Sequence, residues 1–232
     1  MTMDKSNRLK SLSLIICALL FSGNVASAQT NQALRDSLER AIDQLEYHPD
    51  SVDLRLRKAA WNLELNQWEY AKEEYDKILR YHPDNLAALF FRAFANEKMG
   101  RYNFARIDYE SFLRIVPGHF EASLGLALLN EKDKHYTEAM DQMNRLVEQY
   151  PDSTVAYAAR AGMERDRGQL ELAEYDFIQA LKRDSKNKEY ILALSDVLIM
   201  EEKYTEARRG LDYLITLGVS KAVLRDYYKR LK

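Results

Sequence analysis

The tetrapeptide YHPD occupies residues 47–50 and again residues 81–84, 34 positions further along the chain. The four prolines of the whole sequence keep the same interval, at positions 49, 83, 117 and 151. A proline biases the residue before it away from helical geometry, so each proline marks the end of a helix. A fixed period of about 20 to 50 residues is typical of proteins that stack one supersecondary unit several times. The sequence therefore predicts a chain of 34-residue repeats.

Further columns align when each repeat is numbered so that its proline is position 32. Position 20 is alanine in all five repeats, and position 8 is alanine in four and serine in the fifth. Small residues at both positions let the two helices of one repeat approach closely, while bulky residues at positions 24 and 28 fill the space beside them. The two small-residue columns are Ala59, Ala93, Ala127, Ala161 and Ser195, and Ala71, Ala105, Ala139, Ala173 and Ala207.

Position 34 supplies a residue that can begin the next helix. Its members are Ser51, Asn85, His119, Ser153 and Asn187. The serines and asparagines can cap a helix because their side-chain oxygens accept from its free N–H groups. The motif YHPD is thus a helix end followed by a helix start.

Positions 7 and 23 vary together. Lys58 goes with Glu74, Arg92 with Asp108, and Arg160 with Asp176, whereas the two repeats with leucine at position 7 carry no charge at position 23. This pattern predicts a salt bridge between the two helices of each charged repeat. An anion site at the paired arginines is the alternative interpretation.

Position 11 is asparagine in three successive repeats, at Asn62, Asn96 and Asn130. Buried amides need hydrogen-bond partners, so we expect a hydrogen-bonded file between repeats. Binding of a ligand's peptide backbone is the alternative.

These columns together resemble the tetratricopeptide repeat family, over nearly the whole chain after residue 28. The resemblance implies an all-α fold, a right-handed superhelical solenoid of about five helix–turn–helix repeats with a half-repeat helix at each end. We expect a single domain at 29–232. The predicted repeats are 52–85, 86–119, 120–153, 154–187 and 188–221. The predicted flanking helices are 31–47 and 221–232.

Residues 1–28 have the composition of a secretory signal peptide. A basic segment with Lys5, Arg8 and Lys10 precedes an apolar run at 12–21 and the small residues ASA at 26–28. This order predicts cleavage before Gln29 and a periplasmic or secreted protein. A buried or membrane-anchoring helix, and a lipoprotein acylated at Cys17, are the alternatives.

The 204 residues after the predicted cleavage site contain no cysteine, and their formal net charge is −4 against −2 for the whole chain. A weakly acidic, mixed-charge surface gives no reason to expect nucleic acid as a partner. No second long apolar run is present, so we expect no membrane insertion of the mature chain.

Motifs for chemistry are missing from the sequence. The four histidines, His48, His82, His119 and His135, lie in no spacing typical of a metal site, and no phosphate-binding glycine loop occurs. We therefore predict no catalytic residue, no metal and no cofactor, and a protein that is not an enzyme.

The resemblance also implies a binding groove, since the first helices of successive repeats line a concave surface in this family. Positions 2, 5, 9, 12 and 13 tend to face this groove in the family. Carried onto this chain, positions 5 and 9 give a largely apolar floor and positions 12 and 13 a charged rim, which suits a peptide or helix. Packing between repeats is the alternative role for any one of these residues. The candidate groove residues are Leu56, Phe90, Phe94, Lys98, Leu124, Leu128, Lys132 and Arg165.

The leading hypothesis is a non-catalytic scaffold of the cell envelope that binds a segment of another protein in this groove. One alternative is a small-molecule site, for a lipid or glycan fragment, near Phe90 and Phe94. The other is self-association through the same strip, which would give a homo-oligomer.

Overall fold

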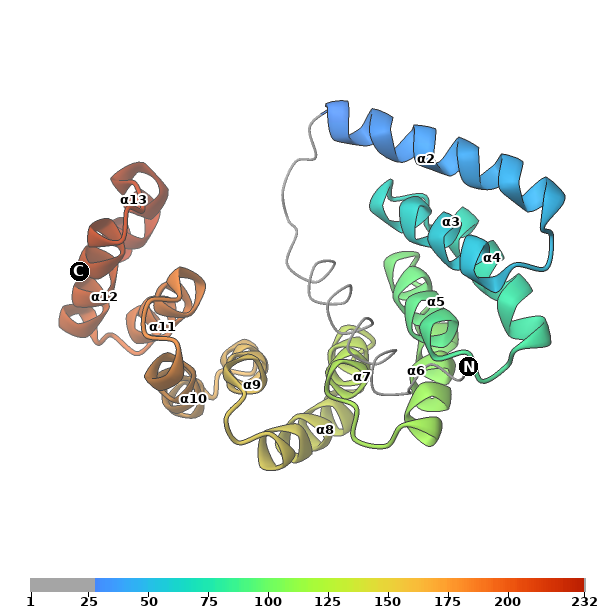
Figure 1. Cartoon of the computed structure of the whole chain (residues 1–232). Helices are drawn as coiled ribbons and strands as arrows, with labels where there is room; N and C mark the ends of the chain where they lie inside the picture. The colour runs from blue at the N-terminus through green and yellow to red at the C-terminus, as the bar shows by residue number, and fades with distance from the viewer. Residues whose placement is uncertain (1–27, 232) are drawn as a thin grey trace. The chain divides into compact units, whose positions relative to one another are not determined.

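In a computed structural model of the chain, the described residues are 28–231, and they form twelve α-helices with no strand among them (Figure 1). The all-α prediction is confirmed for this part of the chain. The predicted signal sequence lies outside the described residues, Cys17 included, except for Ala28, where the first described helix begins.

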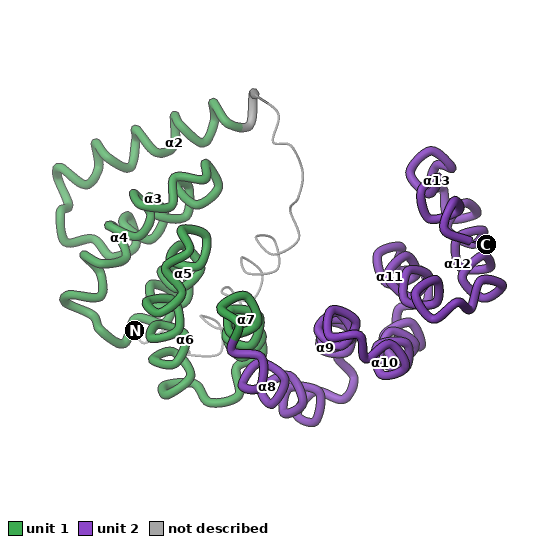
Figure 2. Tube along the Cα trace, turned by 180° about the vertical axis from the view of Figure 1, so that it is seen from behind, with its two compact units in different colours: residues 1–134 green, residues 135–232 purple. Residues whose placement is uncertain are grey.

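The helices belong to two compact units, residues 1–134 and 135–232 (Figure 2). The region predicted as one domain thus divides within the third repeat. Unit 1 contains α2 (Ala28–Tyr47), α3 (Val52–Glu64), α4 (Trp68–Tyr81), α5 (Leu86–Lys98), α6 (Tyr102–Ile115) and α7 (Phe120–Lys132). Unit 2 contains α8 (Tyr136–Gln149), α9 (Thr154–Asp166), α10 (Leu170–Arg183), α11 (Lys188–Met200), α12 (Tyr204–Thr216) and α13 (Lys221–Arg230).

Within each unit, every helix packs against the helix that follows it in sequence. In unit 1 the first helices of successive repeats, α3, α5 and α7, also lie side by side (Figure 1). Nearest-neighbour packing of this kind is what stacked repeats require, because one helix pair alone cannot bury its apolar face.

The small-residue columns are buried at the helix contacts, as predicted. All nine alanines at positions 8 and 20 are completely buried, and Ser195 is 1% exposed. A larger side chain at these sites would overpack the contact, at a cost of about 1 to 3 kcal/mol.

Helix starts follow the predicted caps. The side chains of Ser51, Asn85, Ser153 and Asn187 each accept from a backbone N–H three residues on. His119 does the same through Nδ1, 3.4 Å from the Ala122 nitrogen, which the sequence analysis did not foresee. Burial lowers the pKa of His119 against the pull of nearby Glu121. The imidazole is therefore neutral at pH 7, and its Nδ1 keeps a lone pair for the cap.

The turn between the two helices of each repeat passes through the left-handed region at position 15. Gly100 and Gly168 have φ near +70°, and Asn66, Lys134 and Glu202 have φ of 58°, 64° and 61°. A residue with a Cβ is strained there, least so for asparagine. The repeat therefore imposes this conformation whether or not the sequence supplies glycine.

Candidate functional site

The neighbouring helices α3, α5 and α7 carry five predicted groove residues at or near the surface of unit 1. We call the surface formed by Leu56, Phe94, Lys98, Leu128 and Lys132 the first-helix face. Its apolar members are partly buried and its two lysines are exposed. Leu56 and Phe94 both pack against the same core cluster.

Phe94 is the largest side chain of the first-helix face. The edge of the Trp68 ring meets it, with centroids 6.0 Å apart and planes at 79°. The Lys98 ammonium lies 4.9 Å from the centre of the Phe94 ring, a cation–π contact. Trp68 was not among the predicted site residues, although its repeat position, 17, is aromatic in four of the five repeats. Its neighbours thus fix the orientation of Phe94, and part of the ring stays open to solvent.

A charged pair joins two of the first helices at the rim. Lys132 of α7 forms an ion pair with Glu97 of α5. The carboxylate side chain is only 10% exposed, whereas the lysine is half exposed. The pair ties the two helices together and leaves the Lys98 ammonium of α5 as the more accessible charge beside Phe94.

Two predicted groove residues are buried instead. Phe90 is 4% exposed and Leu124 is 5% exposed. The Phe90 ring meets Tyr109 and Phe112 of α6 edge-on, at centroid distances of 5.6 and 5.9 Å. The expectation that Phe90 is the bulkiest open anchor is therefore corrected, because this side chain fills the space between α5 and α6.

The eighth predicted residue, Arg165, belongs to α9 in unit 2. Its guanidinium bonds the neighbouring Asp166 carboxylate, at 2.7 and 2.9 Å. The first-helix face is thus a feature of unit 1, and Arg165 is not part of it.

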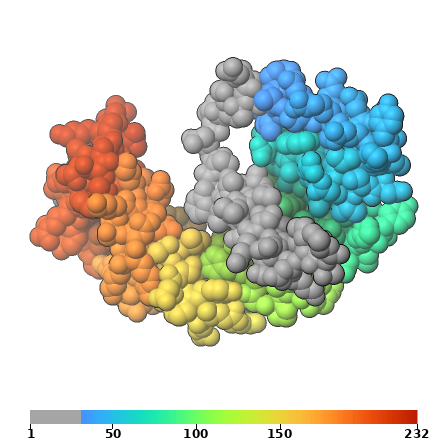
Figure 3. All heavy atoms as spheres, viewed as in Figure 1, coloured from blue at the N-terminus to red at the C-terminus, as the bar shows by residue number. Residues whose placement is uncertain are grey.

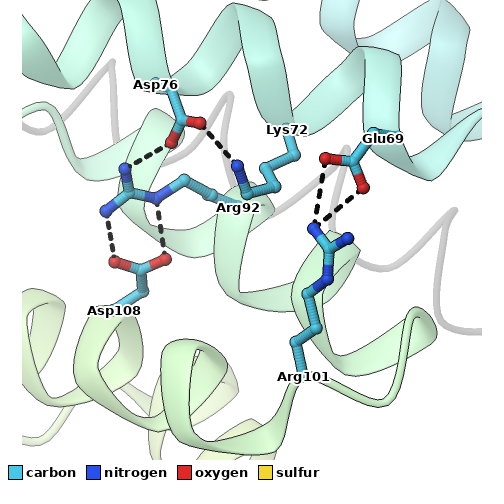
Figure 4. Close-up of polar contacts among 6 residues, drawn as sticks. All are labelled: Glu69, Lys72, Asp76, Arg92, Arg101 and Asp108. Atoms are coloured by element: carbon cyan, nitrogen blue, oxygen red, sulfur yellow. Dashed lines mark hydrogen bonds and ion pairs between the residues drawn. The ribbon is translucent and has the colours of Figure 1, made fainter.

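The charged columns form the predicted salt bridges. Arg92 of α5 donates from Nε and Nη2 to both carboxylate oxygens of Asp108 in α6, at 2.8 and 2.6 Å (Figure 4). Arg160 of α9 holds Asp176 of α10 in the same way, at 2.6 and 2.9 Å. This geometry matches the flat fork of arginine to the carboxylate plane.

The first repeat uses several cations on one carboxylate. Glu74 accepts from Lys58, Lys77 and Arg55, each at 2.8 Å. Burial by itself would raise the pKa of Glu74, but these hydrogen bonds outweigh it and lower that pKa to about 2. Glu74 is therefore ionised throughout the physiological range.

Arg92 also reaches back to the preceding repeat. Its Nη1 donates to Asp76 of α4 at 2.7 Å, and Lys72 holds the other oxygen of that carboxylate (Figure 4). Burial would lower the pKa of Arg92, but Asp108 and Asp76 outweigh it and raise that pKa, so the guanidinium stays charged. All three guanidinium nitrogens are engaged, which argues against the anion-site interpretation.

The comparison of positions 7 and 23 within one repeat did not predict this contact of Arg92 with the preceding repeat. Arg160 makes the equivalent contact to Asn144 of α8 at 3.1 Å. Asp76 and Asn144 share repeat position 25. Ahead of the two repeats with leucine at position 7, the corresponding residues are Glu110 and Ile178. Both arginines at position 7 with a third contact thus follow a polar residue at position 25, but Glu110 shows that the two columns do not vary strictly together.

The asparagine column is buried, with Asn62, Asn96 and Asn130 at 2 to 4% exposure. The Asn130 amide oxygen accepts from Arg106 of the preceding repeat at 2.8 Å, whereas Nδ2 of Asn62 and Oδ1 of Asn96 have no hydrogen-bond partner. One asparagine thus links two repeats, and the predicted continuous file of hydrogen bonds is not formed. Burial leaves these amides no surface for a ligand's backbone, so the structural interpretation is favoured.

Over residues 28–231, no group of three histidine, cysteine or acidic side chains is placed to hold a metal ion. In the same range, no helix combines the length and the apolar character that crossing a membrane requires.

Comparisons with known proteins agree with this architecture. A tetratricopeptide repeat protein from Parabacteroides merdae ATCC 43184 is similar in structure, with a TM-score of 0.68 and 18% identity, over 98% of this chain and 93% of that one. MamA from Desulfovibrio magneticus RS-1, from residue 41 to its end, is similar with a TM-score of 0.64 and 20% identity, over 73% of this chain and 96% of that one. YrrB, described as a TPR protein with an unusual peptide-binding site, has a TM-score of 0.56 and 19% identity, over 75% of this chain and 90% of that one. At such identities the likeness shows the fold alone.

A search of curated protein sequences finds no match. A family model described as "Protein kinase G tetratricopeptide repeat" matches residues 16–209, well over half of the sequence. Together with the helix pairs, the buried small-residue columns and the period of 34, this match shows that the chain belongs to the tetratricopeptide repeat family.

Proposed function

We propose that this protein is a non-catalytic interaction scaffold of the cell envelope, and that the first-helix face of unit 1 binds a peptide or helix of a partner protein. The observation that carries the proposal is the partly open Phe94 ring, held between Trp68 and the exposed Lys98. An aromatic anchor oriented by its neighbours loses little conformational entropy on binding, and such anchors dominate the energetics of protein interfaces.

The charges around Phe94 suggest how a bound segment is oriented. Lys98 and Lys132 lie on the same face, and Lys132 shares its charge with Glu97. A partner segment with an apolar side chain over Phe94 and a carboxylate toward Lys98 is complementary to this surface. YrrB is a relative in fold whose description names a peptide-binding site, and this supports a peptide as the kind of ligand.

Affinity capture with a matched control tests the binding surface. The wild-type protein and the Phe94→Ala and Phe104→Ala variants are immobilised, and the captured proteins are identified and then titrated in purified form. Phe104 is 63% exposed and belongs to α6, the second helix of the same repeat. We expect Phe94→Ala to weaken binding of the specific partner by about tenfold or more, and Phe104→Ala to leave it unchanged. Equal affinity of both variants, with unchanged helical circular dichroism, would refute the first-helix face as the site.

The envelope location is a separate part of the proposal and rests on the composition of residues 1–28. Cell fractionation with intact-mass measurement tests it. We expect the chain in the periplasm or the medium, with Gln29 as its first residue. A cytoplasmic protein that retains residues 1–28 would contradict the location without affecting the binding surface.

A further inference from the structure

The last thirty residues differ in charge from the rest of the chain. Residues 203–232 contain eight lysines or arginines and three acidic residues, a formal charge of +5, whereas residues 29–202 carry −9. A charge asymmetry of this kind indicates an electrostatic partner for one end of the molecule. The described part of the basic segment is α12, α13 and the turn between them.

Four exposed cations gather around Tyr228 on α12 and α13. We call Arg208, Lys221, Arg225 and Lys229 the basic C-terminal surface. Two open depressions, both lined by Tyr228, lie between these residues. The Arg208 guanidinium lies 5.9 Å from the centre of the Tyr228 ring, and helices α12 and α13 form the red surface in Figure 3.

The carboxylates nearby neutralise this surface only in part. Asp226 pairs with Lys229 at 2.9 Å and with Arg225 at 3.8 Å. Asp212 accepts instead from the Tyr228 hydroxyl, at 2.5 Å. No carboxylate within residues 31–231 forms an ion pair with Arg208 or Lys221. Excess positive charge is therefore available to a partner.

The chain itself carries a matching acidic surface on α2. Asp36, Glu39, Asp43 and Glu46 recur at intervals of three and four residues, which places them along one face of the helix, with Arg35 and Arg40 at its two edges. All four are exposed, and among the described side chains no lysine or arginine forms an ion pair with them. The opposite side of α2 packs on α3, where Ala41 is 2% exposed.

The two charged faces also match in length. The carboxylates from Asp36 to Glu46 extend about 15 Å along α2, at a rise of about 1.5 Å per residue. Lys221, Arg225 and Lys229 follow one another at intervals of four on α13 and extend about 12 Å. Two helices laid side by side can therefore pair most of these charges at once.

We propose that the basic C-terminal surface of one molecule binds the acidic face of α2 of a second copy, head to tail. The two surfaces belong to different units, so after a first contact one copy keeps its acidic face unused and the other copy keeps its basic surface unused. Repetition of the contact then gives either a closed ring or an open chain of copies. The first-helix face takes no part in this contact.

Sedimentation velocity on the purified full chain tests the proposal. At about 20 mM NaCl we expect association that increases with protein concentration, and at about 500 mM NaCl mainly monomer, because salt screens exposed charges. A wild-type protein that stays monomeric at low salt and high concentration would overturn the proposal. A monomer under these conditions is also the result expected if the two faces pair within one molecule, or if the basic surface binds an acidic segment of another protein.

Charge reversal then identifies the surfaces. One variant carries Lys221→Glu, Arg225→Glu and Lys229→Glu, and the other carries Asp36→Lys, Glu39→Lys, Asp43→Lys and Glu46→Lys. Each variant alone presents like charges to its own copies, so we expect monomers. In an equimolar mixture the reversed α13 of one variant faces the reversed α2 of the other, and the unchanged faces also match, so association should return.

A matched control separates this contact from general charge effects. The variant Lys182→Glu, Lys186→Glu and Lys188→Glu changes the net charge of unit 2 by the same amount at other exposed sites. Its association constant at low salt should stay within about twofold of the wild-type value. Association that survives either reversal, or a mixture of folded variants that remains monomeric, would overturn the head-to-tail contact.

Discussion

The helix pair α5–α6 in unit 1 and the pair α9–α10 in unit 2 hold the same arginine–aspartate fork at the same repeat positions. They differ in the residue beside it at position 11, which is Asn96 in the first pair and Glu164 in the second. Both side chains are buried, at 2% and 6% exposure. The pair α11–α12 carries no fork, and Gly210 lies where the aspartate would be.

The comparison shows that position 11 beside the same fork can hold either a neutral amide or a carboxyl group. A neutral amide beside the fork needs only hydrogen bonds. A carboxyl group at the same place lies near Asp176, and its closest cation in the fork, the Arg160 Nε, is 3.8 Å away. Burial, followed by the charge of Asp176, raises the pKa of Glu164 to about 7 against the opposing pull of Arg160 and Arg167. The shared helix pair therefore tolerates very different electrostatics.

The largest expected effect comes from removing the fork in unit 1. Arg92→Leu should lower the free energy of unfolding by about 4 kcal/mol, since it strands the buried Asp108 carboxylate. The double variant with Asp108→Leu should lose less than the single variant, because no charge is then left unpaired. Urea unfolding, monitored by circular dichroism, measures wild type, the two single variants and the double variant, which together form a double-mutant cycle. Strict additivity of the two single changes would show that the fork is not an energetic unit.

The next effect is a dependence of stability on pH that we expect in unit 2, where position 11 is Glu164, and not in unit 1, where it is an asparagine. The folded-state pKa of Glu164 lies above the ordinary value of 4.5, so the folded state keeps this proton longer than the unfolded state. The contribution of Glu164 to stability is complete below pH 4.5 and is lost as the pH rises toward 7, in total about 3 kcal/mol. Glu164→Gln should therefore unfold at higher urea than wild type at pH 8.

Asparagine 96 provides the reciprocal test. Asn96→Glu places a carboxyl beside Asp108 and should introduce into unit 1 the loss of stability with rising pH that Glu164 causes in unit 2. The same urea series at pH 5 and pH 8 measures it. Equal pH dependence of wild type, Glu164→Gln and Asn96→Glu would mean that position 11 does not govern this titration.

A smaller effect is expected in the pair without a fork. A Cβ added at Gly210 would clash with the Ser195 hydroxyl, which donates to the Ile191 carbonyl at 2.8 Å. Gly210→Ala should cost about 1 to 2 kcal/mol. Adding Ser195→Ala leaves only an ordinary contact with the Ser195 Cβ, 3.6 Å away. The thermal midpoint of the double variant should return to at least the wild-type value, and no recovery would exclude the clash as the cause.

The smallest effect concerns the turn at position 15. Glu202 has φ of 61°, whereas the equivalent Gly168 reaches φ of 73° without a Cβ. Glu202→Gly should stabilise unit 2 by about 1 kcal/mol, and Gly168→Ala should destabilise it by a similar amount. Thermal unfolding compares the two variants. A lower midpoint for Glu202→Gly would indicate that flexibility of the unfolded glycine chain outweighs the relief of strain.

Much of the helical framework could be read from the sequence because the period repeats the same packing problem. The alanine columns, four of the caps and the three charged pairs each depend on a contact within one repeat or at its boundary, and all are confirmed. Contacts that join one repeat to the next, such as Arg92 with Asp76, were missed.

The candidate site was harder to predict than the framework. Phe90 and Phe94 look equivalent in the sequence, one helical turn apart on α5. They differ because Tyr109 and Phe112 of α6 receive the Phe90 ring, whereas Phe94 meets Trp68 and Lys98 near the surface. Side-chain fit between helices decides which of two similar positions is open, and spacing alone does not record it.

Site-specific photocrosslinking in cells that express the protein tests the central claim most directly. A photoreactive phenylalanine replaces Lys98 on the first-helix face in one variant, and in the other it replaces Ile107, which is 57% exposed on α6. We predict a discrete covalent adduct with one partner protein from position 98 and none from position 107. Adducts from position 107 without any from position 98 would contradict the account.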